Sequence, residues 1–170
     1  PEIVGNVYGY VWVDWDKSGT RTSIEDGVEE HVVGAVVTLT NTTDYLDEDG
    51  QVLYGPGKEW EATTGDGLKG GSDSGDYRWF IENVPVVDES GKTQEYTVEV
   101  NYADATFPSG FVPAGYTVQN NEDNVLADET DSDVAPLAES RGESAPFALV
   151  ENLDEHRADA GVVTDIAFEP

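Results

Sequence analysis

Apolar and polar residues alternate along most of this chain, and no long stretch repeats with a helical period. Alternation with period two is typical of β-strands, whose successive side chains point to opposite faces. The pattern predicts seven or eight short strands, namely Val7–Val13, Gly34–Thr40, Trp60–Thr64, Tyr77–Val84, Tyr96–Tyr102, Gly115–Gln119, Phe147–Val150 and Val162–Phe168. Because Gly, Pro, Asn and Asp separate these strands, the chain predicts an all-β fold, an antiparallel β-sandwich.

Three of these strands show most clearly which side chains share a face. The shared faces are Val7, Gly9, Val11 and Val13, then Ala35, Val37 and Leu39, and then Tyr96, Val98, Val100 and Tyr102. The opposite face of the first strand carries Tyr8, Tyr10 and Trp12. In the other two strands the opposite face is mainly polar, as expected where only one face meets a core.

The connections between the predicted strands are uneven in length. Residues 14–31, 41–58, 65–76 and 120–145 form long, polar and acidic segments. Loops above roughly 12 to 15 residues are uncommon in a compact domain and are usually functional or disordered. Each segment is therefore either a surface insertion or a loop organised around a metal ion. The total length of 170 residues predicts a single domain spanning 1–170.

Charge narrows the function classes. The chain has 36 Asp and Glu against 8 Lys and Arg, for a formal charge of -28. Such acidity disfavours binding to nucleic acid and to anionic lipid, both of which need cationic side chains. The apolar runs are far shorter than the roughly 18 residues of a membrane span. The aromatic fraction of 10% is enough to build a core, so the composition predicts a folded domain rather than an acidic disordered chain.

Two further features of the composition matter for the site. The absence of Cys excludes disulfides, thiolate zinc sites and a cysteine nucleophile. A charge of -28 repels itself when the chain compacts, and a bound divalent cation would relieve part of that repulsion. The first residue is not Met and no signal sequence is visible, so we expect a piece of a longer protein.

The segment that starts at Asp14 has the spacing of a calcium loop. Ca²⁺ takes six to eight oxygen ligands, and the EF-hand loop supplies them from alternating positions around a Gly at its sixth position. Counting from Asp14, that Gly is Gly19, and the acid at the twelfth position is Glu25. The predicted side-chain ligands are Asp14, Asp16, Ser18 and Glu25, with the Thr20 carbonyl and with Thr22 directly or through water.

Strands rather than helices flank this loop, so it is not an EF-hand. The competing interpretation is an acidic turn held by local hydrogen bonds without an ion. Because the Gly and five oxygen positions all fall in place, and the loop opens directly from an apolar strand, we expect Ca²⁺ as the cofactor.

The same residues resemble a known family. The segments Val11–Asp14, Ser18–Gly19 and Gly34–Leu39, with Asp16 and Glu25, look like the opening of an SdrD B-like repeat of Gram-positive bacterial surface proteins. Further similar segments follow in the family's order: Tyr77, Trp79, Ile81 and Asn83–Pro85, then Tyr96–Val100, Asp131–Asp133 and Asp159–Val162. The segments 41–58, 65–76 and 85–95 depart from the family, whose members turn more tightly there.

The resemblance implies a Cna-B-like, prealbumin-like (Ig-like) sandwich that binds several Ca²⁺ ions. It implies a calcium-stiffened spacer or stalk module of a secreted or wall-anchored adhesin or pilus-like protein. The implied partners are adjacent domains of the same surface protein and, in some cases, a host extracellular ligand. The module would be monomeric and extracellular.

Other acidic clusters are candidates for further ions. Asp128, Asp131 and Asp133 form a second cluster, which Asp159 would approach if the last strand lies near the first. Asp66, Asp73 and Asp76 form a third, in a Gly-rich stretch more typical of flexible turns. The acids between Asp44 and Asp49 are the weakest candidate, because Asp49-Gly50 is itself a turn signal.

The sequence does not predict the internal covalent cross-links of related modules, and it does not predict catalysis. A Lys-to-Asn isopeptide bond is not expected, because Val7–Val13 has no Lys and Val162–Phe168 has no Asn. A Thr-to-Gln ester is not expected either, since no Gln follows Gln119. His31 and His156 have no evident partners, and no catalytic carboxylate pair stands out, so we expect no enzyme activity.

Ligand recognition is the alternative function. β-Sandwiches bind glycans or host proteins through exposed aromatic side chains and loops. Trp15, Trp60 and Tyr54 lie in or near loops and would serve that purpose. The period of the sequence favours the plainer interpretation, in which Trp15 packs over the calcium loop and Trp60 fills a core.

Overall fold

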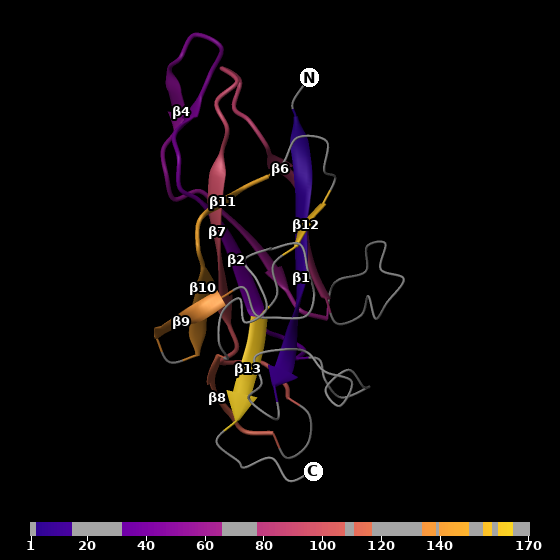
Figure 1. Ribbon diagram of the computed structural model, residues 1–170. Helices are drawn as coiled ribbons and strands as arrows, with labels where there is room; N and C mark the ends of the chain where they lie inside the picture. The colour runs from indigo at the N-terminus through magenta and orange to yellow at the C-terminus, as the bar shows by residue number, and fades with distance from the viewer. Residues whose placement is uncertain are drawn as a thin grey trace.

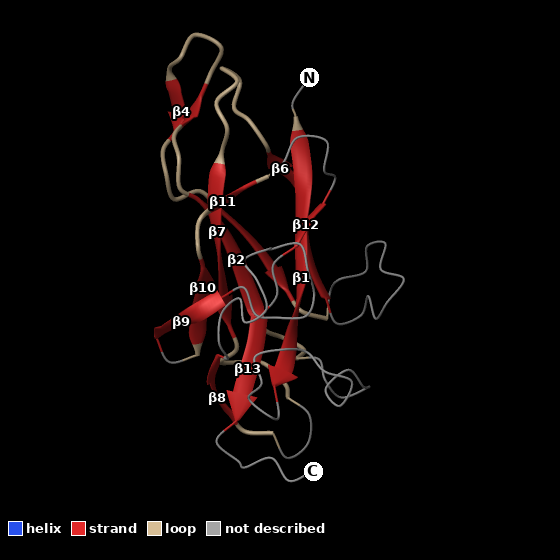
Figure 2. Cartoon of the chain, in the orientation of Figure 1, coloured by secondary structure: helices blue, strands red, loops and turns tan. Residues whose placement is uncertain are grey.

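The computed structural model describes residues 3–14, 32–65, 78–107, 111–116, 134–138, 140–149, 155–157 and 160–164. Within these ranges every regular element is a β-strand, as Figure 2 shows, and none is a helix long and apolar enough to cross a membrane. The strands are β1 (Val4–Asp14), β2 (Val36–Asn41), β3 (Tyr45–Leu46), β4 (Val52–Tyr54), β5 (Glu59–Thr63), β6 (Arg78–Pro85), β7 (Glu95–Asn101), β8 (Pro113–Tyr116), β9 (Val134–Ala138), β10 (Arg141–Ser144), β11 (Phe147–Ala148), β12 (Glu155–Arg157) and β13 (Ala160–Thr164).

The strands form two main sheets around one core. In the five-stranded sheet β1 is central, with β6 on one side and β12 and β13 on the other, and β8 lies beyond β13. The six-stranded sheet has the order β5-β2-β7-β10-β9, and β11 also pairs with β7. Buried side chains from both sheets, such as Val11 and Leu39, belong to one hydrophobic cluster. The all-β, mostly antiparallel fold therefore agrees with the predicted sandwich.

The inward faces follow the predicted alternation. Val7, Val11 and Val13 are fully buried, and β2 and, from Tyr96 onward, β7 alternate between buried and half-buried side chains. Trp12 points away from Val11 and Val13 and does not belong to the core cluster, yet it is also fully buried. The outer face of β1 is therefore covered at this position, so both faces of the strand are buried near its end.

The first and last strands run parallel, which is the exception in an otherwise antiparallel fold (Figure 1). Tyr8 pairs with Arg157, and Val11 pairs with Ala160. Two residues lie between Tyr8 and Val11 on β1, and two lie between Arg157 and Ala160. The numbers are equal, so β12 and β13 share one register with β1. Since the strands are parallel, β1 begins and β13 ends at opposite ends of the sheet.

Two segments expected to be long loops contain strands instead. Segment 41–58 forms the β3–β4 hairpin, and 120–145 contains the β9–β10 pair. Segment 85–95 also folds back on itself, with Val87 bridging to Thr93. The short apolar stretches in these segments are too brief to show a period, so their pairing depends on turns rather than on alternation.

The β3–β4 hairpin and the 86–94 turn lie side by side beyond the ends of the sheets, as Figure 1 shows, and we call them the projection. The backbone N–H of Glu89 donates to the Leu46 carbonyl at 3.1 Å. The Gln94 side chain is fully buried, and its amide donates to the Asp44 carbonyl at 3.1 Å. Two of the three segments that depart from the resembled family, 41–58 and 85–95, therefore form one joint substructure.

Candidate functional site

The predicted calcium ligands fall almost entirely outside the described residues. Asp14 is the last residue of β1, where its backbone pairs with Val163. The following predicted ligands lie outside the described ranges: Asp16, Ser18, Thr20, Thr22, Glu25, Asp128, Asp131, Asp133 and Asp159. The third candidate cluster, Asp66, Asp73 and Asp76, also lies outside them. Among the residues that are described, no group of three or more His, Asp or Glu is placed to hold a metal.

The two ends of the first predicted calcium segment are described, and both are anchored at β1. The chain leaves the sheet at Asp14, and the backbone N–H of Val32 donates to the Val11 carbonyl at 3.0 Å. Val32 is fully buried, and the next residues continue the anchor, since Gly34 N–H donates to the Thr64 carbonyl at 3.0 Å. The segment 15–31 thus starts and ends beside the same buried strand.

The second predicted calcium segment begins close to the first. Val13 pairs with Val162, and Val162 pairs with Tyr116, the last described residue before 117–133. These three residues form one row across β1, β13 and β8. Because neighbouring strands lie about 4.8 Å apart, the row brings Tyr116 to roughly 10 Å from β1. Two acidic segments therefore leave the same sheet within one row of each other.

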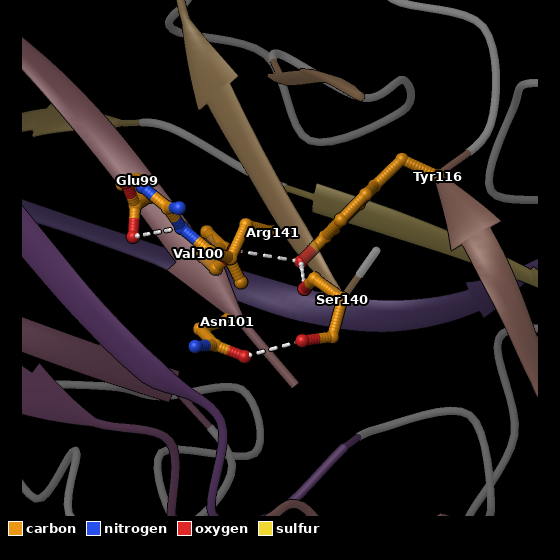
Figure 3. A network of polar contacts seen from close by, with 6 residues as sticks. All are labelled: Glu99, Val100, Asn101, Tyr116, Ser140 and Arg141. Atoms are coloured by element: carbon orange, nitrogen blue, oxygen red, sulfur yellow. Dashed lines mark hydrogen bonds and ion pairs between the residues drawn. The ribbon is translucent and has the colours of Figure 1, made fainter. Parts of the chain in front are cut away.

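Tyr116 joins this sheet to the opposite one (Figure 3). Its hydroxyl lies 2.8 Å from the Val100 carbonyl of β7 and 2.7 Å from the Ser140 carbonyl, and it donates its single proton toward these two acceptors. Tyr116 is only 7% exposed. Burial raises the pKa of the phenol, and the nearby Tyr102 and Glu99 raise it further, so the hydroxyl stays a neutral donor.

The polar contacts continue from Ser140 to the outer face of the six-stranded sheet. The Ser140 hydroxyl donates to Asn101 Oδ1 at 2.7 Å. Arg141 next to it donates from Nε and Nη2 to the two carboxylate oxygens of Glu99, at 3.1 and 2.7 Å (Figure 3). The hydrogen bonds and the charge of Glu99 raise the pKa of Arg141. The pair is solvent-exposed, so it orients the β7–β10 edge and adds little stability.

The last strand does lie beside the first, which was the condition for involving Asp159 in a second site. The flanking residues Arg157 and Ala160 pair with Tyr8 and Val11. Asp159 itself lies outside the described residues. Its contribution to a metal site therefore stays a prediction.

A buried acid in the projection was not singled out from sequence. Asp88 is 4% exposed. One carboxylate oxygen accepts from the N–H groups of Ser90 and Lys92 and from the Ser90 hydroxyl, at 2.9, 2.8 and 2.6 Å. The other oxygen accepts from Leu46 N–H at 3.0 Å. Burial by itself would raise the pKa of Asp88, but these hydrogen bonds outweigh it and lower the pKa.

The Asp88 turn had a readable signal. The run Asp88-Glu89-Ser90-Gly91-Lys92 has an Asx residue two positions before a Ser and three before a Gly, which is typical of a tight turn. Gly91 has a φ of 93°, a left-handed conformation that favours Gly. The partner across the projection, Leu46, could not be read from sequence.

The acids between Asp44 and Asp49 form a turn, as their Asp-Gly pair indicated. Asp47 Oδ1 accepts from the N–H groups of Asp49 and Gln51 at 2.8 and 2.9 Å. Gly50 has a φ of 82°. The carboxylate of Asp47 therefore closes the hairpin between β3 and β4.

Two of the aromatic residues considered for ligand recognition are described, and they lie around one lysine. Lys58 Nζ lies 4.6 Å from the Tyr54 ring centre and 5.4 Å from that of Trp60. Tyr54 stacks on Tyr45 at 4.8 Å, and Trp60 packs edge-on against the buried Tyr96. Trp60 thus belongs partly to the core, as the period of the sequence favoured, while Trp15 lies outside the described residues.

Comparison with protein-family models and with curated proteins gave no match. The likeness to SdrD B-like repeats therefore depends on the quoted residues alone.

Proposed function

We propose that this chain is a calcium-stabilised spacer module of a bacterial cell-surface protein. One observation supports this above the others. The ligand spacing of residues 14–25 begins at the end of the buried strand β1, and the residue that follows this segment, Val32, is hydrogen-bonded to Val11 of the same strand. A segment whose two ends are already fixed loses less conformational entropy when its oxygens gather around an ion than a segment with free ends would. The proposal is thus supported by the spacing of the ligands together with the two fixed ends of the segment, Asp14 and Val32.

The mechanism is ligation linked to folding. Ca²⁺ that binds the folded chain and not the unfolded chain stabilises it by RT ln(1 + [Ca²⁺]/Kd). At a calcium concentration 100 times Kd this amounts to about 2.7 kcal/mol. Extracellular calcium modules have Kd values of about 10⁻⁴ to 10⁻³ M, which suits a protein outside the cell.

The topology suits a module that transmits tension. The parallel pairing of β1 with β12 and β13 extends from Asn6 opposite Glu155 to Asp14 opposite Val163. A pull on the start of β1 and the end of β13 would shear these strands, so the load falls on many backbone hydrogen bonds at once. This arrangement supports a spacer between adjacent domains of one surface protein.

Direct recognition of a host protein or a glycan is the second candidate. It would use Tyr54 and Trp60, whose rings are engaged by Lys58, Tyr45 and Tyr96. Rings engaged in this way offer less free face for a sugar than unoccupied rings do. The spacer function is therefore favoured, and binding on a glycan array or to host matrix proteins would reverse that preference.

Thermal unfolding tests the proposal. We expect the melting temperature to rise when CaCl₂ is added after EDTA treatment, and to rise less when NaCl is added at the same ionic strength. Tb³⁺ offers a second measurement, because Trp12 and Trp15 flank Asp14 and would sensitise its luminescence. Equal responses to CaCl₂ and NaCl, without calorimetric Ca²⁺ binding, would show that the acids are only a solvated coat.

Variants assign the response to the first loop. Asp14→Ala with Asp16→Ala should remove one calcium site. Asp49→Ala with Asp104→Ala is the matched control, because both side chains are exposed and the same charge is lost. Native mass spectrometry would count the ions in each protein. A control pair that loses as much calcium as the test pair would contradict a specific site.

A further inference from the structure

A cavity of about 460 Å³ opens in the projection, at the end of the molecule where β1 begins. It is lined by Ile3, Tyr45, Glu48, Val87, Asp88, Glu89 and Gly91. The volume falls within the roughly 300 to 1,000 Å³ of ordinary ligand pockets. Asp14 lies eleven positions after Ile3 along β1, or roughly 36 Å at about 3.3 Å per residue, so the cavity is remote from the strand end where the first predicted calcium segment begins.

The cavity combines an apolar wall with negative charge. Tyr45, Val87 and Ile3 supply the apolar surface, and Tyr45 is held in place by stacking on Tyr54 at 4.8 Å. Glu48 and Glu89 are exposed at the rim, and neither carboxylate makes a hydrogen bond or ion pair within the described part of the chain. None of the described residues that line the cavity is Lys, Arg or His.

Asp88 adds a negative charge that makes no ion pair with a cation in the described part of the chain. Asp88 is 4% exposed and is a lining residue of the cavity, while its hydrogen-bond donors are backbone N–H groups and one hydroxyl, all neutral. Lys92 donates only its backbone N–H to Asp88 and is not a lining residue. These hydrogen bonds keep the carboxylate ionised without cancelling its charge, so a cation in the adjacent cavity would be attracted to it.

We propose that this cavity binds a lysine or arginine side chain presented by a partner protein. Such a side chain has an apolar stem and a cationic head, which match the Tyr45–Val87 wall and the carboxylates of Glu48, Glu89 and Asp88. Glu48 and Glu89 would contact the cationic head directly, and the buried Asp88 would attract it electrostatically. The inference does not depend on the calcium proposal for residues 14–25, because it uses none of the ligands predicted there and none of Asp128, Asp131, Asp133 and Asp159.

Nuclear magnetic resonance of the full chain tests this pocket. The probe is Nα-acetyl-lysine methylamide, and the matched probe without charge is Nα-acetyl-norleucine methylamide. The amide signals of Leu46, Ser90 and Lys92 report on the site, since all three donate to Asp88. We expect saturable shifts of these signals with the lysine probe and at least tenfold weaker binding of the norleucine probe.

Two double variants separate a built pocket from general attraction to an acidic protein. Glu48→Gln with Glu89→Gln should weaken lysine binding by about tenfold, the effect of losing roughly 1.4 kcal/mol. Glu59→Gln with Glu61→Gln, on the edge strand β5, changes the charge equally and should alter binding less than twofold. Equal losses in both variants, non-saturating shifts, or equal binding of norleucine would each overturn the proposal.

The measurement is made both in EDTA and with CaCl₂. If the lysine probe binds equally well in EDTA and in CaCl₂, the pocket proposal stands even when calcium has no effect on the melting temperature. A loss of lysine binding on addition of CaCl₂ would show that the rim prefers a divalent ion and would overturn the assignment to a side chain.

Discussion

The ring of Tyr116 lies directly over Gly142. A Cβ built on Gly142 would come within 2.9 Å of Tyr116 Cδ2 and Cε2, closer than real Cβ contacts. Gly142 belongs to β10 of the six-stranded sheet, and Tyr116 belongs to β8 of the five-stranded sheet. The missing side chain thus lets a tyrosine reach across the sandwich and bond to the backbone of the opposite sheet.

We expect Gly142→Ala to destabilise the fold by about 1–3 kcal/mol, because the added methyl group displaces the Tyr116 ring. Chemical denaturation followed by tryptophan fluorescence measures the change. Gly55→Ala is the control, because its Cβ would meet only Asp44 Oδ1 at an ordinary 3.6 Å. A stability loss of the same size in both variants would contradict the contact with Tyr116.

Tyr116→Phe keeps the ring and removes the hydroxyl. The Val100 and Ser140 carbonyls then lose the hydroxyl as a donor, while the Tyr102 N–H still donates to Ser140 at 3.2 Å, and we expect a loss of about 1–2 kcal/mol. The same denaturation experiment measures it. In the wild-type protein the raised pKa also predicts that Tyr116 does not ionise in an alkaline titration until the fold is lost, which absorbance at 295 nm would follow.

Asp88 predicts a dependence of stability on pH. Its folded pKa lies below the ordinary value of an Asp side chain, so its contribution to stability is present above the unfolded pKa and is lost as the pH falls through the folded pKa. Asp88→Asn should therefore cost about 1–3 kcal/mol near neutral pH, and the difference from the wild type should shrink in acid. Asp49→Asn, at an exposed turn position, should show no such difference at either pH.

Monovalent salt should stabilise the chain apart from any effect of calcium. A net charge of -28 repels itself in the compact state, and the screening length falls from about 10 Å at 0.1 M to about 3 Å at 1 M salt. We expect the melting temperature to rise steadily with NaCl and KCl alike. A melting temperature that does not change with either salt would show that the acids lie too far apart to repel one another.

The parallel terminal strands predict a direction-dependent resistance to force. Single-molecule pulling from the start of β1 and the end of β13 should need a higher unfolding force than pulling from Ile3 and Glu89, which would unzip β1 from β6 beginning at the Val4–Pro85 pair. The chain has no Cys, so each pair of attachment points can be introduced as unique cysteines. Equal forces in both directions would contradict a shear-loaded β1–β13 pair.

The faces of β1, β2 and β7 could be predicted from sequence because alternation is a local property. Val37 and Leu39 are buried while Thr38 and Thr40 are half-buried, as their order along the strand requires. The turn at Asp49-Gly50 was equally readable, since Gly supplies the left-handed conformation there. The ligand spacing from Asp14 to Glu25 is also a local pattern, and it stays a prediction because residues 15–31 lie outside the described ranges.

Tertiary structure alone decided which distant segments meet. No period in the sequence indicates that β13 runs parallel to β1, that Tyr116 reaches Ser140, or that Asp88 binds the backbone of Leu46. These contacts join residues far apart in the chain, and they depend on how both sheets and the projection pack together. The sequence by itself determined which side chains turn inward and which oxygens are spaced for an ion, whereas packing between remote segments determined which partners they face.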